Sequence, residues 1–153
     1  MFEFLKDIKE LEDVESVEKI NKGYSKDEKF KIKLKNKSGY LLLRLSDISL
    51  YEQKKEEYEV ISKFSKLGFE MSKPFSFGIC NDEKNVYILL SWIDGVDLSE
   101  ELPKFSIEEQ YLLGRKAGRI LKAIHSLKVE DKKFDDSLKI KILDKIDNKN
   151  KEE

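Results

Sequence analysis

Apolar and charged residues alternate between positions 29 and 35 of the chain, and a period of two is the spacing of a half-buried strand. Phe30, Ile32 and Leu34 are separated by lysines, so this segment predicts a strand with one face in the core and the other in water. Other apolar runs bounded by turn residues predict four more strands, at residues 16–20, 40–47, 75–80 and 86–90. The pattern therefore predicts five strands.

Helical spacing appears before the first strand and again after the third. At the N-terminus it is carried by Phe4, Leu5, Ile8 and Leu11. These residues predict a short amphipathic helix that covers the sheet. After the third strand, Ser49 and Glu52 form a capping-box sequence, which predicts a helix from Ser49 to about residue 67.

A further helical pattern follows the fifth strand. Ser106 and Glu109 form a second capping-box sequence, and an apolar stripe continues from there to about residue 127. The stripe contains Gly114 and Gly118, and a glycine inside a helix costs about 1 kcal/mol relative to alanine. We therefore expect another segment to pack closely against this face.

One cation interrupts the apolar run at 40–47. Side chains alternate along a strand, so Arg44 shares a face with Leu42, and a guanidinium among apolar residues needs an anion beside it. Glu57, on the apolar face of the following helix, is the candidate. Protein kinases hold the α- and β-phosphates of ATP with such a strand cation and helix carboxylate. The alternative is that both charges are solvated, as we expect for Lys54 and its charged neighbours.

The loop between the first two strands contains a second candidate feature. Gly23 permits a positive φ and a close approach of the backbone, and the Ser25 hydroxyl and nearby N–H groups could face a phosphate. An ordinary hairpin turn explains the same residues. Both interpretations stay open at this point.

The composition excludes several function classes. The 153 residues include 30 basic and 31 acidic side chains, and the net charge of −1 argues against a nucleic-acid partner. Cys80 is the sole cysteine and His125 the sole histidine, so neither an internal disulfide nor a Cys/His metal cluster is possible. The charged N-terminus is unlike a signal peptide, and no apolar stretch reaches membrane-spanning length. We expect a cytoplasmic protein without a membrane partner.

Taken in order, these features resemble the aminoglycoside phosphotransferase family, bacterial small-molecule kinases with a protein-kinase-like fold, from about residue 14 to about residue 146. The resemblance implies an α+β fold, with a protein-kinase-like small lobe made of a five-stranded antiparallel sheet and one inserted helix. The first helices of an incomplete helical lobe would follow. The expected division is a nucleotide-binding small lobe at 1–93, a hinge and first helices at 94–127, and a charged tail at 128–153.

The resemblance also implies a site for ATP or GTP. The loop around Gly23 looks like the family's shortened nucleotide loop, while Arg44 and Glu57 match its strand cation and helix glutamate. Residues 89–95 look like its hinge, in which the Ser91 carbonyl and the Ile93 N–H would bind adenine. The nucleotide-binding residues implied in this way are Gly23, Tyr24, Ser25, Leu42, Arg44, Glu57, Ser91 and Ile93.

Two departures from the family pattern change the expected function. Arg44 stands where many relatives have lysine, and a guanidinium is larger and differently hydrated. The family's His-Gly-Asp catalytic loop has no counterpart, because His125 is followed by Ser126 and Leu127, and the metal-binding Asp segment is missing too. We therefore expect the front half of an enzyme, which binds nucleotide but lacks the magnesium ligands and the acceptor site.

The leading hypothesis is thus the N-terminal portion of an ATP- or GTP-dependent small-molecule phosphotransferase, whose acceptor in the complete enzyme would be an aminoglycoside antibiotic. A second hypothesis is a non-catalytic, kinase-like module that docks a partner through the helix face around Gly114, Ala117 and Gly118. A third is a structural α+β domain without a ligand.

Overall fold

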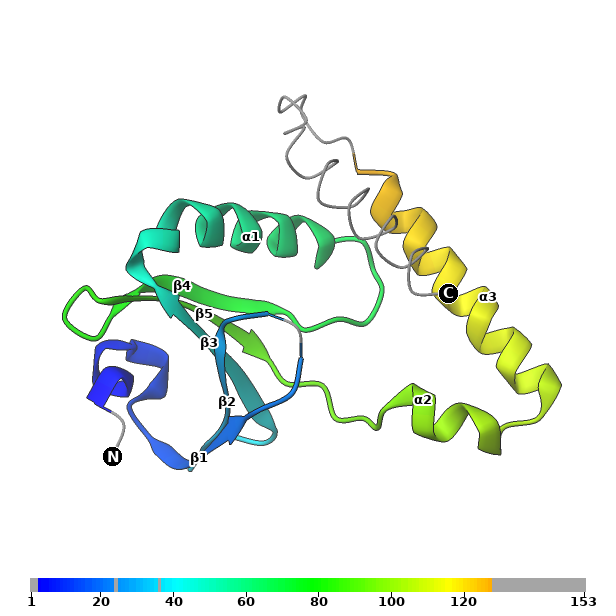
Figure 1. Cartoon of the computed structure of the whole chain (residues 1–153), viewed down its shortest axis with the longest axis horizontal. Helices are drawn as coiled ribbons and strands as arrows, with labels where there is room; N and C mark the ends of the chain where they lie inside the picture. Colours follow the sequence, from blue (N-terminus) through cyan, green and yellow to red (C-terminus); the bar gives the residue numbers. More distant parts are fainter. Residues whose placement is uncertain (1–2, 24, 36, 128–153) are drawn as a thin grey trace, which may run out of the picture.

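The computed structural model describes residues 3–23, 25–35 and 37–127. Its centre is an antiparallel sheet with the strand order β1-β2-β3-β5-β4 (Figure 1). The strands are β1 (Val14–Ile20), β2 (Glu28–Leu34), β3 (Tyr40–Asp47), β4 (Pro74–Cys80) and β5 (Asn85–Ser91). One α-helix, α1 (Tyr51–Phe64), is inserted between β3 and β4. The predicted kinase-like small lobe of five strands and one inserted helix is therefore confirmed.

One face of the sheet carries the hydrophobic core. Phe30 of β2 is paired with Leu43 of β3, which is paired in turn with Leu89 of β5, and all three are almost fully buried. Because the side chains of paired residues lie on the same face, these three strands present one continuous apolar surface. On the opposite face, β2 and β3 include charged residues such as Lys29 and Arg44, while β5 has the buried apolar residues Val86, Ile88 and Leu90.

The N-terminal segment covers this apolar face, but not as the single amphipathic helix that was predicted. It forms two 3-10 helices, η1 (Glu3–Asp7) and η2 (Lys9–Leu11). Leu5, Ile8 and Leu11 are buried in the core, and they are three positions apart. Ile8 joins the two 3-10 helices in an extended conformation, with φ −107° and ψ 102°, so no continuous helix forms across it.

Helix α1 lies on the other face of the sheet, against β4 and β5 (Figure 1). Tyr51 and Tyr58 are two turns apart on the helix, and both contact the ring of Phe77 on β4, with centroid distances of 5.4 and 5.6 Å. These aromatic contacts fix the rotation of α1. They direct its remaining inner side chains toward the middle of the sheet.

The start of this helix differs from the prediction. A 3-10 turn at Ile48–Leu50 precedes α1, and the residue that caps this turn is Asp47 rather than Ser49. The Asp47 carboxylate accepts hydrogen bonds from the Ser49 backbone N–H at 2.9 Å and from its hydroxyl at 2.6 Å. Ser49 is thus a donor here, because a carboxylate is the stronger acceptor. The helix ends at Phe64, about one turn earlier than expected.

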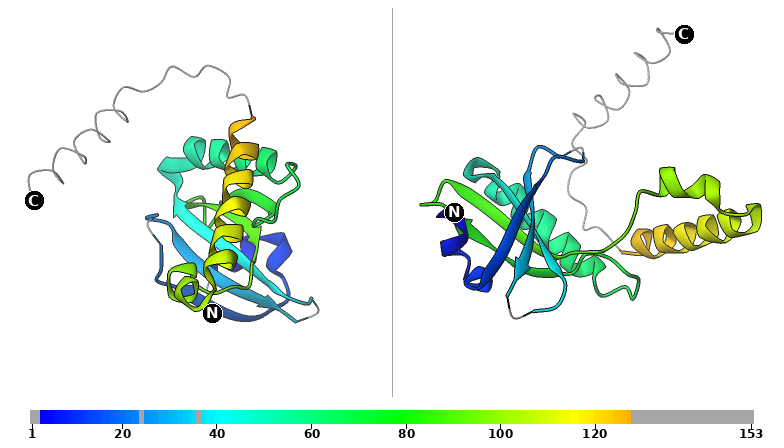
Figure 2. Two further views of the ribbon diagram at one scale, coloured as in Figure 1. Left: turned by 90° about the vertical axis from the view of Figure 1, so that its right-hand side faces the viewer. Right: turned by 90° about the horizontal axis from the view of Figure 1, so that it is seen from below.

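Two α-helices follow the sheet, α2 (Leu98–Glu101) and α3 (Ile107–His125), with the 3-10 turn η4 (Leu102–Lys104) between them. The second capping box is confirmed. The Glu109 N–H donates to the Ser106 hydroxyl at 3.3 Å, and the Ser106 N–H donates to the Glu109 carboxylate at 2.8 Å. Both α-helices lie beside the sheet rather than on it (Figures 1 and 2).

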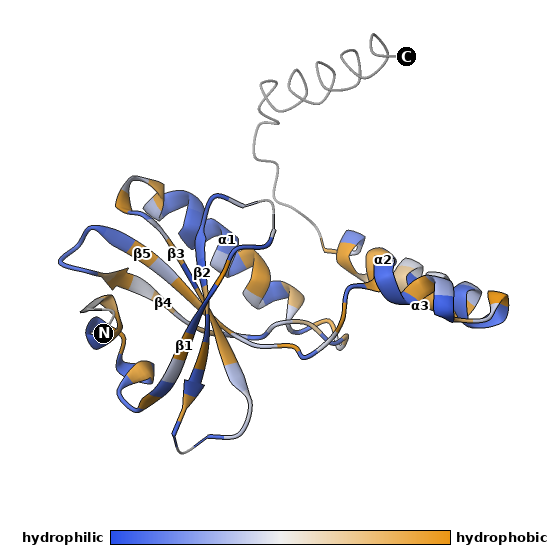
Figure 3. Cartoon of the chain, turned by 60° about the horizontal axis from the view of Figure 1, so that its bottom comes forward, coloured by the Kyte–Doolittle hydropathy of each residue, from blue (hydrophilic) through white to orange (hydrophobic). Residues whose placement is uncertain are grey.

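Helix α3 has no buried residue in the described part of the chain. Ile107 is 86% exposed and Tyr111 is 64% exposed, and apolar positions are visible along the helix in Figure 3. A side chain added at Gly114 or Gly118 would meet no described atom within 4 Å. The close packing that we expected at these two glycines is therefore not present among the described residues.

The predicted charged tail at 128–153 lies outside the described residues, and the division at residues 93 and 127 stays a prediction. Over the residues that are described, no helix combines the length and the apolar character that crossing a bilayer requires.

Candidate functional site

Four charged side chains form a closed ring on the face of the sheet opposite the core. They are Asp27, Arg44, Lys54 and Glu57, and we call them the charge ring. Arg44 Nη1 lies 2.6 Å from Glu57 Oε1, and Lys54 Nζ lies 3.0 Å from Glu57 Oε2. Lys54 Nζ is also 2.7 Å from Asp27 Oδ1, and Arg44 Nη2 pairs with Asp27 Oδ2. Each cation thus touches both anions, and the formal charges cancel.

Three parts of the chain meet in the charge ring. Arg44 is on β3, where it is paired with Lys29 of β2 on one side and Ile88 of β5 on the other. Lys54 and Glu57 are three positions apart on α1, so both lie on one face of the helix. Asp27 immediately precedes β2 and reaches the ring from the loop between β1 and β2.

Asp27 is the most completely coordinated member of the ring. Its carboxylate accepts from Arg44 Nε at 2.9 Å, from the Ser46 hydroxyl at 2.9 Å and from Lys54 Nζ, and its side chain is 5% exposed. Burial acts to raise the pKa of Asp27, but hydrogen bonds from Lys54, Arg44 and Ser46 outweigh it and lower the pKa to about 2. Asp27 therefore carries its negative charge throughout the physiological pH range.

Arg44 is the member of the charge ring that lies on a strand, and it contacts both carboxylates. Burial acts to lower the pKa of Arg44, but the hydrogen bond to Asp27 and the attraction of Glu57 raise it above its usual value. Its side chain is 16% exposed, so the guanidinium is largely shielded from water but not enclosed.

The ion pair predicted between Arg44 and Glu57 is present. Sequence reasoning missed the other two members of the ring. Lys54 was expected to be a solvated surface charge, yet its side chain is 8% exposed. The signal that could have identified it is its position one turn before Glu57 on the same helix face. Asp27 gave no comparable signal, because its partners are 17 and 27 positions away.

The loop with the predicted phosphate-contacting residues lies next to Asp27. Gly23 has a φ of +103°, which favours glycine, and Ser25 is exposed to solvent. Lys29 Nζ lies 3.3 Å from the carbonyl oxygens of both Lys22 and Ser25, which ties the loop to β2. Tyr24 lies outside the described residues. The roles of Gly23, Tyr24 and Ser25 in binding a ligand stay predictions.

The backbone N–H groups at the start of the predicted hinge differ in whether they are paired. The Ser91 N–H donates to the Lys73 carbonyl at 2.8 Å, and the Trp92 N–H donates to the Tyr40 carbonyl at 3.1 Å. Within the described part of the chain the Ile93 N–H donates no hydrogen bond, and Ile93 is 51% exposed. The Ile93 N–H is therefore free to bind a ligand, while a nucleotide contact from Ser91 or Ile93 stays a prediction.

Leu42, the predicted contact to the base, lies on the face of Arg44 between Lys31 of β2 and Leu90 of β5. The neighbouring Lys31 was expected to be a solvated charge. Instead Lys31 Nζ lies 4.1 Å from the ring centroid of Tyr40 and 4.7 Å from that of Trp92. These cation–π contacts attach the segment after β5 to the middle of the sheet, so they help to fix the position of the hinge.

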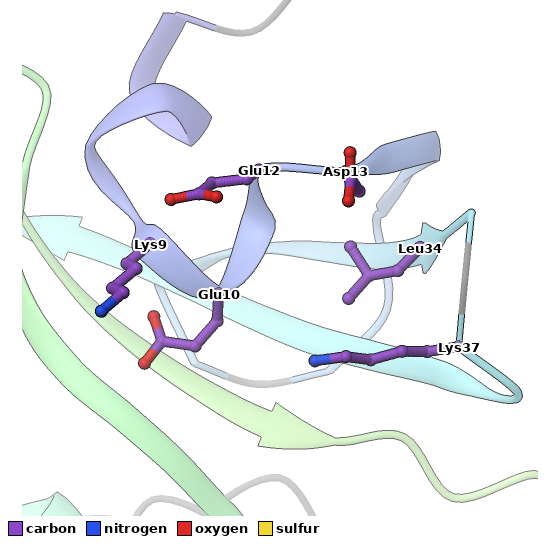
Figure 4. Close-up of a pocket in the computed structure, with 6 residues that line it drawn as sticks. All are labelled: Lys9, Glu10, Glu12, Asp13, Leu34 and Lys37. Atoms are coloured by element: carbon purple, nitrogen blue, oxygen red, sulfur yellow. The ribbon is translucent and has the colours of Figure 1, made fainter.

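Several pockets of the described surface lie away from the charge ring. One of about 540 Å³ is lined by residues that include Leu5, Leu11 and Val17. Another of about 300 Å³ is lined by residues that include Leu41, Leu89 and Ser91, on the face of the sheet opposite Arg44. Figure 4 shows a smaller pocket of about 190 Å³, lined by Lys9, Glu10, Glu12, Asp13, Leu34 and Lys37. Among the described residues no group of three or more His, Cys, Asp or Glu side chains could hold a metal ion. The charge ring, which holds two cations that are largely shielded from water, is the candidate site.

Comparisons with known proteins give two matches. A family model described as "Phosphotransferase enzyme family" matches residues 16–151. A solved structure, the crystal structure of the M. tuberculosis PknI kinase domain, matches with a TM-score of 0.45 and 11% identity, over 74% of this chain and 49% of that one. The chain thus spans about half the length of that kinase domain. Among curated proteins, no match is found.

Proposed function

The chain belongs to the phosphotransferase enzyme family, and from this premise we propose that it binds the nucleoside triphosphate, ATP or GTP, of a kinase-like phosphotransferase. The observation that carries the proposal is the contact between Arg44 of β3 and Glu57 of α1, at 2.6 Å. A cation held by a helix carboxylate at this place in the sheet is the arrangement that kinases use to position the α- and β-phosphates.

In this proposal each predicted residue has a distinct role. Arg44 contacts phosphate oxygens, and Glu57 orients the guanidinium. Leu42 packs against the base, while the Ser91 carbonyl and the Ile93 N–H bind its edge. The remaining contacts to the phosphates come from the loop of Gly23, Tyr24 and Ser25.

The charges of the site fit a triphosphate under one condition. Arg44 and Lys54 offer two cations that are shielded from bulk water, which strengthens their attraction for an anion. Both are already neutralised by Asp27 and Glu57. A phosphate therefore binds well only if one of the carboxylates gives up its place.

We extend the proposal to the complete enzyme, in which an aminoglycoside antibiotic would accept the phosphoryl group and magnesium would be bound by residues outside this chain. A cytoplasmic location belongs to the same proposal, and Cys80, a free and buried thiol, is in keeping with a reducing compartment.

Titration of the 153-residue chain with ATP and with GTP, followed by calorimetry, tests nucleotide binding. We expect a dissociation constant of roughly 1 mM, which corresponds to about −4 kcal/mol, because only one side of a nucleotide site is present. Arg44→Ala should abolish measurable binding. Arg119→Ala, which removes an exposed arginine of α3, is the matched control and should bind as the unaltered chain does. Equal binding by both variants would contradict the proposal.

One observation favours a second candidate function, a kinase-like module that docks a partner. Ile107, Tyr111, Leu112 and Leu121 of α3 are each more than half exposed. Apolar side chains gathered on one helix are typical of a surface that another protein segment covers. A folded chain that binds neither ATP nor GTP would favour this alternative over the nucleotide-binding lobe.

A further inference from the structure

We propose that Asp27 is a displaceable counter-ion. In the free protein its carboxylate occupies the place between Arg44 and Lys54 that phosphate oxygens take when a nucleotide binds, so binding expels Asp27 from the charge ring. The inference rests on the proposed function, and it adds Lys54 to the residues that contact phosphate.

The first argument is the geometry of the contacts. The Asp27 carboxylate accepts from Arg44 Nε at 2.9 Å, from the Ser46 hydroxyl at 2.9 Å and from Lys54 Nζ at 2.7 Å. A guanidinium, an ammonium and a hydroxyl that converge on two oxygen atoms form an anion site, and a phosphate group offers the same kind of acceptor to the same donors. The site is thus already built, with a carboxylate in it.

The second argument is that the two carboxylates of the ring differ in how they are held. Glu57 lies in the middle of α1, and in kinases the helix carboxylate at this place stays paired with the strand cation while the phosphates are bound, so Glu57 remains with Arg44. Asp27 lies before the first residue of β2, in a loop whose neighbours Ser25 and Lys26 are exposed. A rotation of this loop moves Asp27 into water and leaves the sheet unchanged. Asp27 is therefore the carboxylate that an incoming anion displaces.

The third argument concerns charge. Removing the partner of a buried cation is costly unless another anion takes its place. We therefore expect Asp27 to leave only when a phosphate replaces it, so that the site is never empty. After the exchange the two cations face only Glu57, and this leaves one positive charge to attract the phosphate. In the free protein Asp27 occupies the place that the phosphate needs. A ligand must therefore displace Asp27 before it can bind, and this lowers the apparent affinity of the protein for the ligand.

The exchange also moves the nucleotide loop. Gly23 and Ser25 are two to four positions from Asp27, and Lys29 Nζ holds the loop through weak contacts of 3.3 Å to the Lys22 and Ser25 carbonyls. Departure of Asp27 removes the hydrogen bonds that tie this end of the loop to Arg44 and Lys54.

The test compares Asp27→Asn with the unaltered 153-residue chain, using inorganic tripolyphosphate as the probe because it needs no base-binding site. We expect Asp27→Asn to bind tripolyphosphate about tenfold more tightly, a change of about 1.4 kcal/mol. Asp82→Asn is the matched control, because it removes one negative charge at an exposed turn with a positive φ, where asparagine is well tolerated. It should leave the affinity unchanged.

Ser46→Ala provides a second variant in case Asp27→Asn does not fold. It keeps all four charges and removes only one hydrogen bond that holds Asp27, so it should tighten tripolyphosphate binding by about threefold. If the folded variants bind tripolyphosphate no more tightly than the unaltered chain, the counter-ion proposal is overturned.

The same titrations, repeated with ATP, separate this inference from the proposed function. If ATP binds no more tightly than tripolyphosphate but Asp27→Asn strengthens both, the counter-ion stands and the nucleotide-binding function fails. If ATP binds more tightly than tripolyphosphate and neither variant changes its affinity, the function stands and the counter-ion fails. If neither probe binds to any chain, both are overturned.

Discussion

The ammonium group of Lys54 lies 2.7 Å from the carboxylate of Asp27, although the two residues are 27 positions apart and belong to different elements. This contact joins α1 to the loop between β1 and β2. It makes Lys54 part of the charge ring rather than part of the solvated surface of the helix.

Lys54→Met should destabilise the fold by about 2 kcal/mol, because it leaves two carboxylates with one shared cation in a largely buried position. Chemical denaturation measures the change. Lys55→Met is the control, since Lys55 is exposed and its replacement should change the free energy of unfolding by less than about 0.5 kcal/mol. A second substitution, Asp27→Asn, should recover part of the loss in Lys54→Met. Additive losses would show that the two residues are not coupled.

Acid should remove the contribution of Asp27 to stability. Its pKa is about 2 in the folded protein and lies near 3.8 for an unpaired carboxyl, so the folded state favours the charged form. The stabilisation is fully present above about pH 4 and is lost as the pH falls toward 2, and it amounts to about 2 kcal/mol. Unfolding free energies measured between pH 5 and pH 2 should therefore fall less steeply for Asp27→Asn. Parallel curves would contradict the assignment.

Gly78→Ala should destabilise the sheet by about 1 to 3 kcal/mol. A Cβ at this position would lie 2.9 Å from Cε1 and 3.0 Å from the hydroxyl oxygen of Tyr87, on the neighbouring strand β5. Thermal unfolding measures the effect.

Gly114→Ala should have the opposite effect. No described atom lies within 4 Å of a Cβ added at Gly114, and alanine is more favourable than glycine inside a helix by about 1 kcal/mol. It should raise the helical signal in circular dichroism, and a loss of helix there would be unexpected.

The 153-residue chain should not transfer phosphate above background. Phosphoryl transfer requires a group that orients the acceptor and ligands that hold magnesium, and the sequence has no His-Gly-Asp segment. Incubation with labelled ATP, magnesium and a panel of aminoglycosides measures the rate. Turnover that depends on magnesium and is abolished in Arg44→Ala would show that the chain contains catalytic groups we have not recognised.

Local patterns in the sequence were sufficient to predict the sheet, the inserted helix and the contact between Arg44 and Glu57. The alternation around Phe30 and the capping box at Ser106 depend on neighbours within a few positions, which a sequence displays directly. The helix start at Ser49 was wrong because the Asp47 carboxylate, two positions earlier, accepts from the Ser49 backbone N–H and caps a 3-10 turn there.

The parts of the site that sequence reasoning missed depend on tertiary contacts. Lys54 stands in a run of charged residues, and only the rotation of α1, set by its aromatic contacts to β4, directs it inward. Asp27 looks like an ordinary loop aspartate until the start of β2 is placed next to Arg44. Burial of a charge is decided by the partner that it meets, and the partner is remote in sequence.

The closed ring of charges has a consequence for how this sequence can evolve. Each of the four residues touches members of opposite charge, so a mutation that neutralises one of them leaves a neighbour uncompensated. A substitution that removes one charge of the ring should therefore be accompanied by a second substitution that removes a charge of the opposite sign. A homologue with a neutral residue in place of Asp27 should also have lost the lysine at position 54, while the charges at positions 44 and 57 should be lost only together.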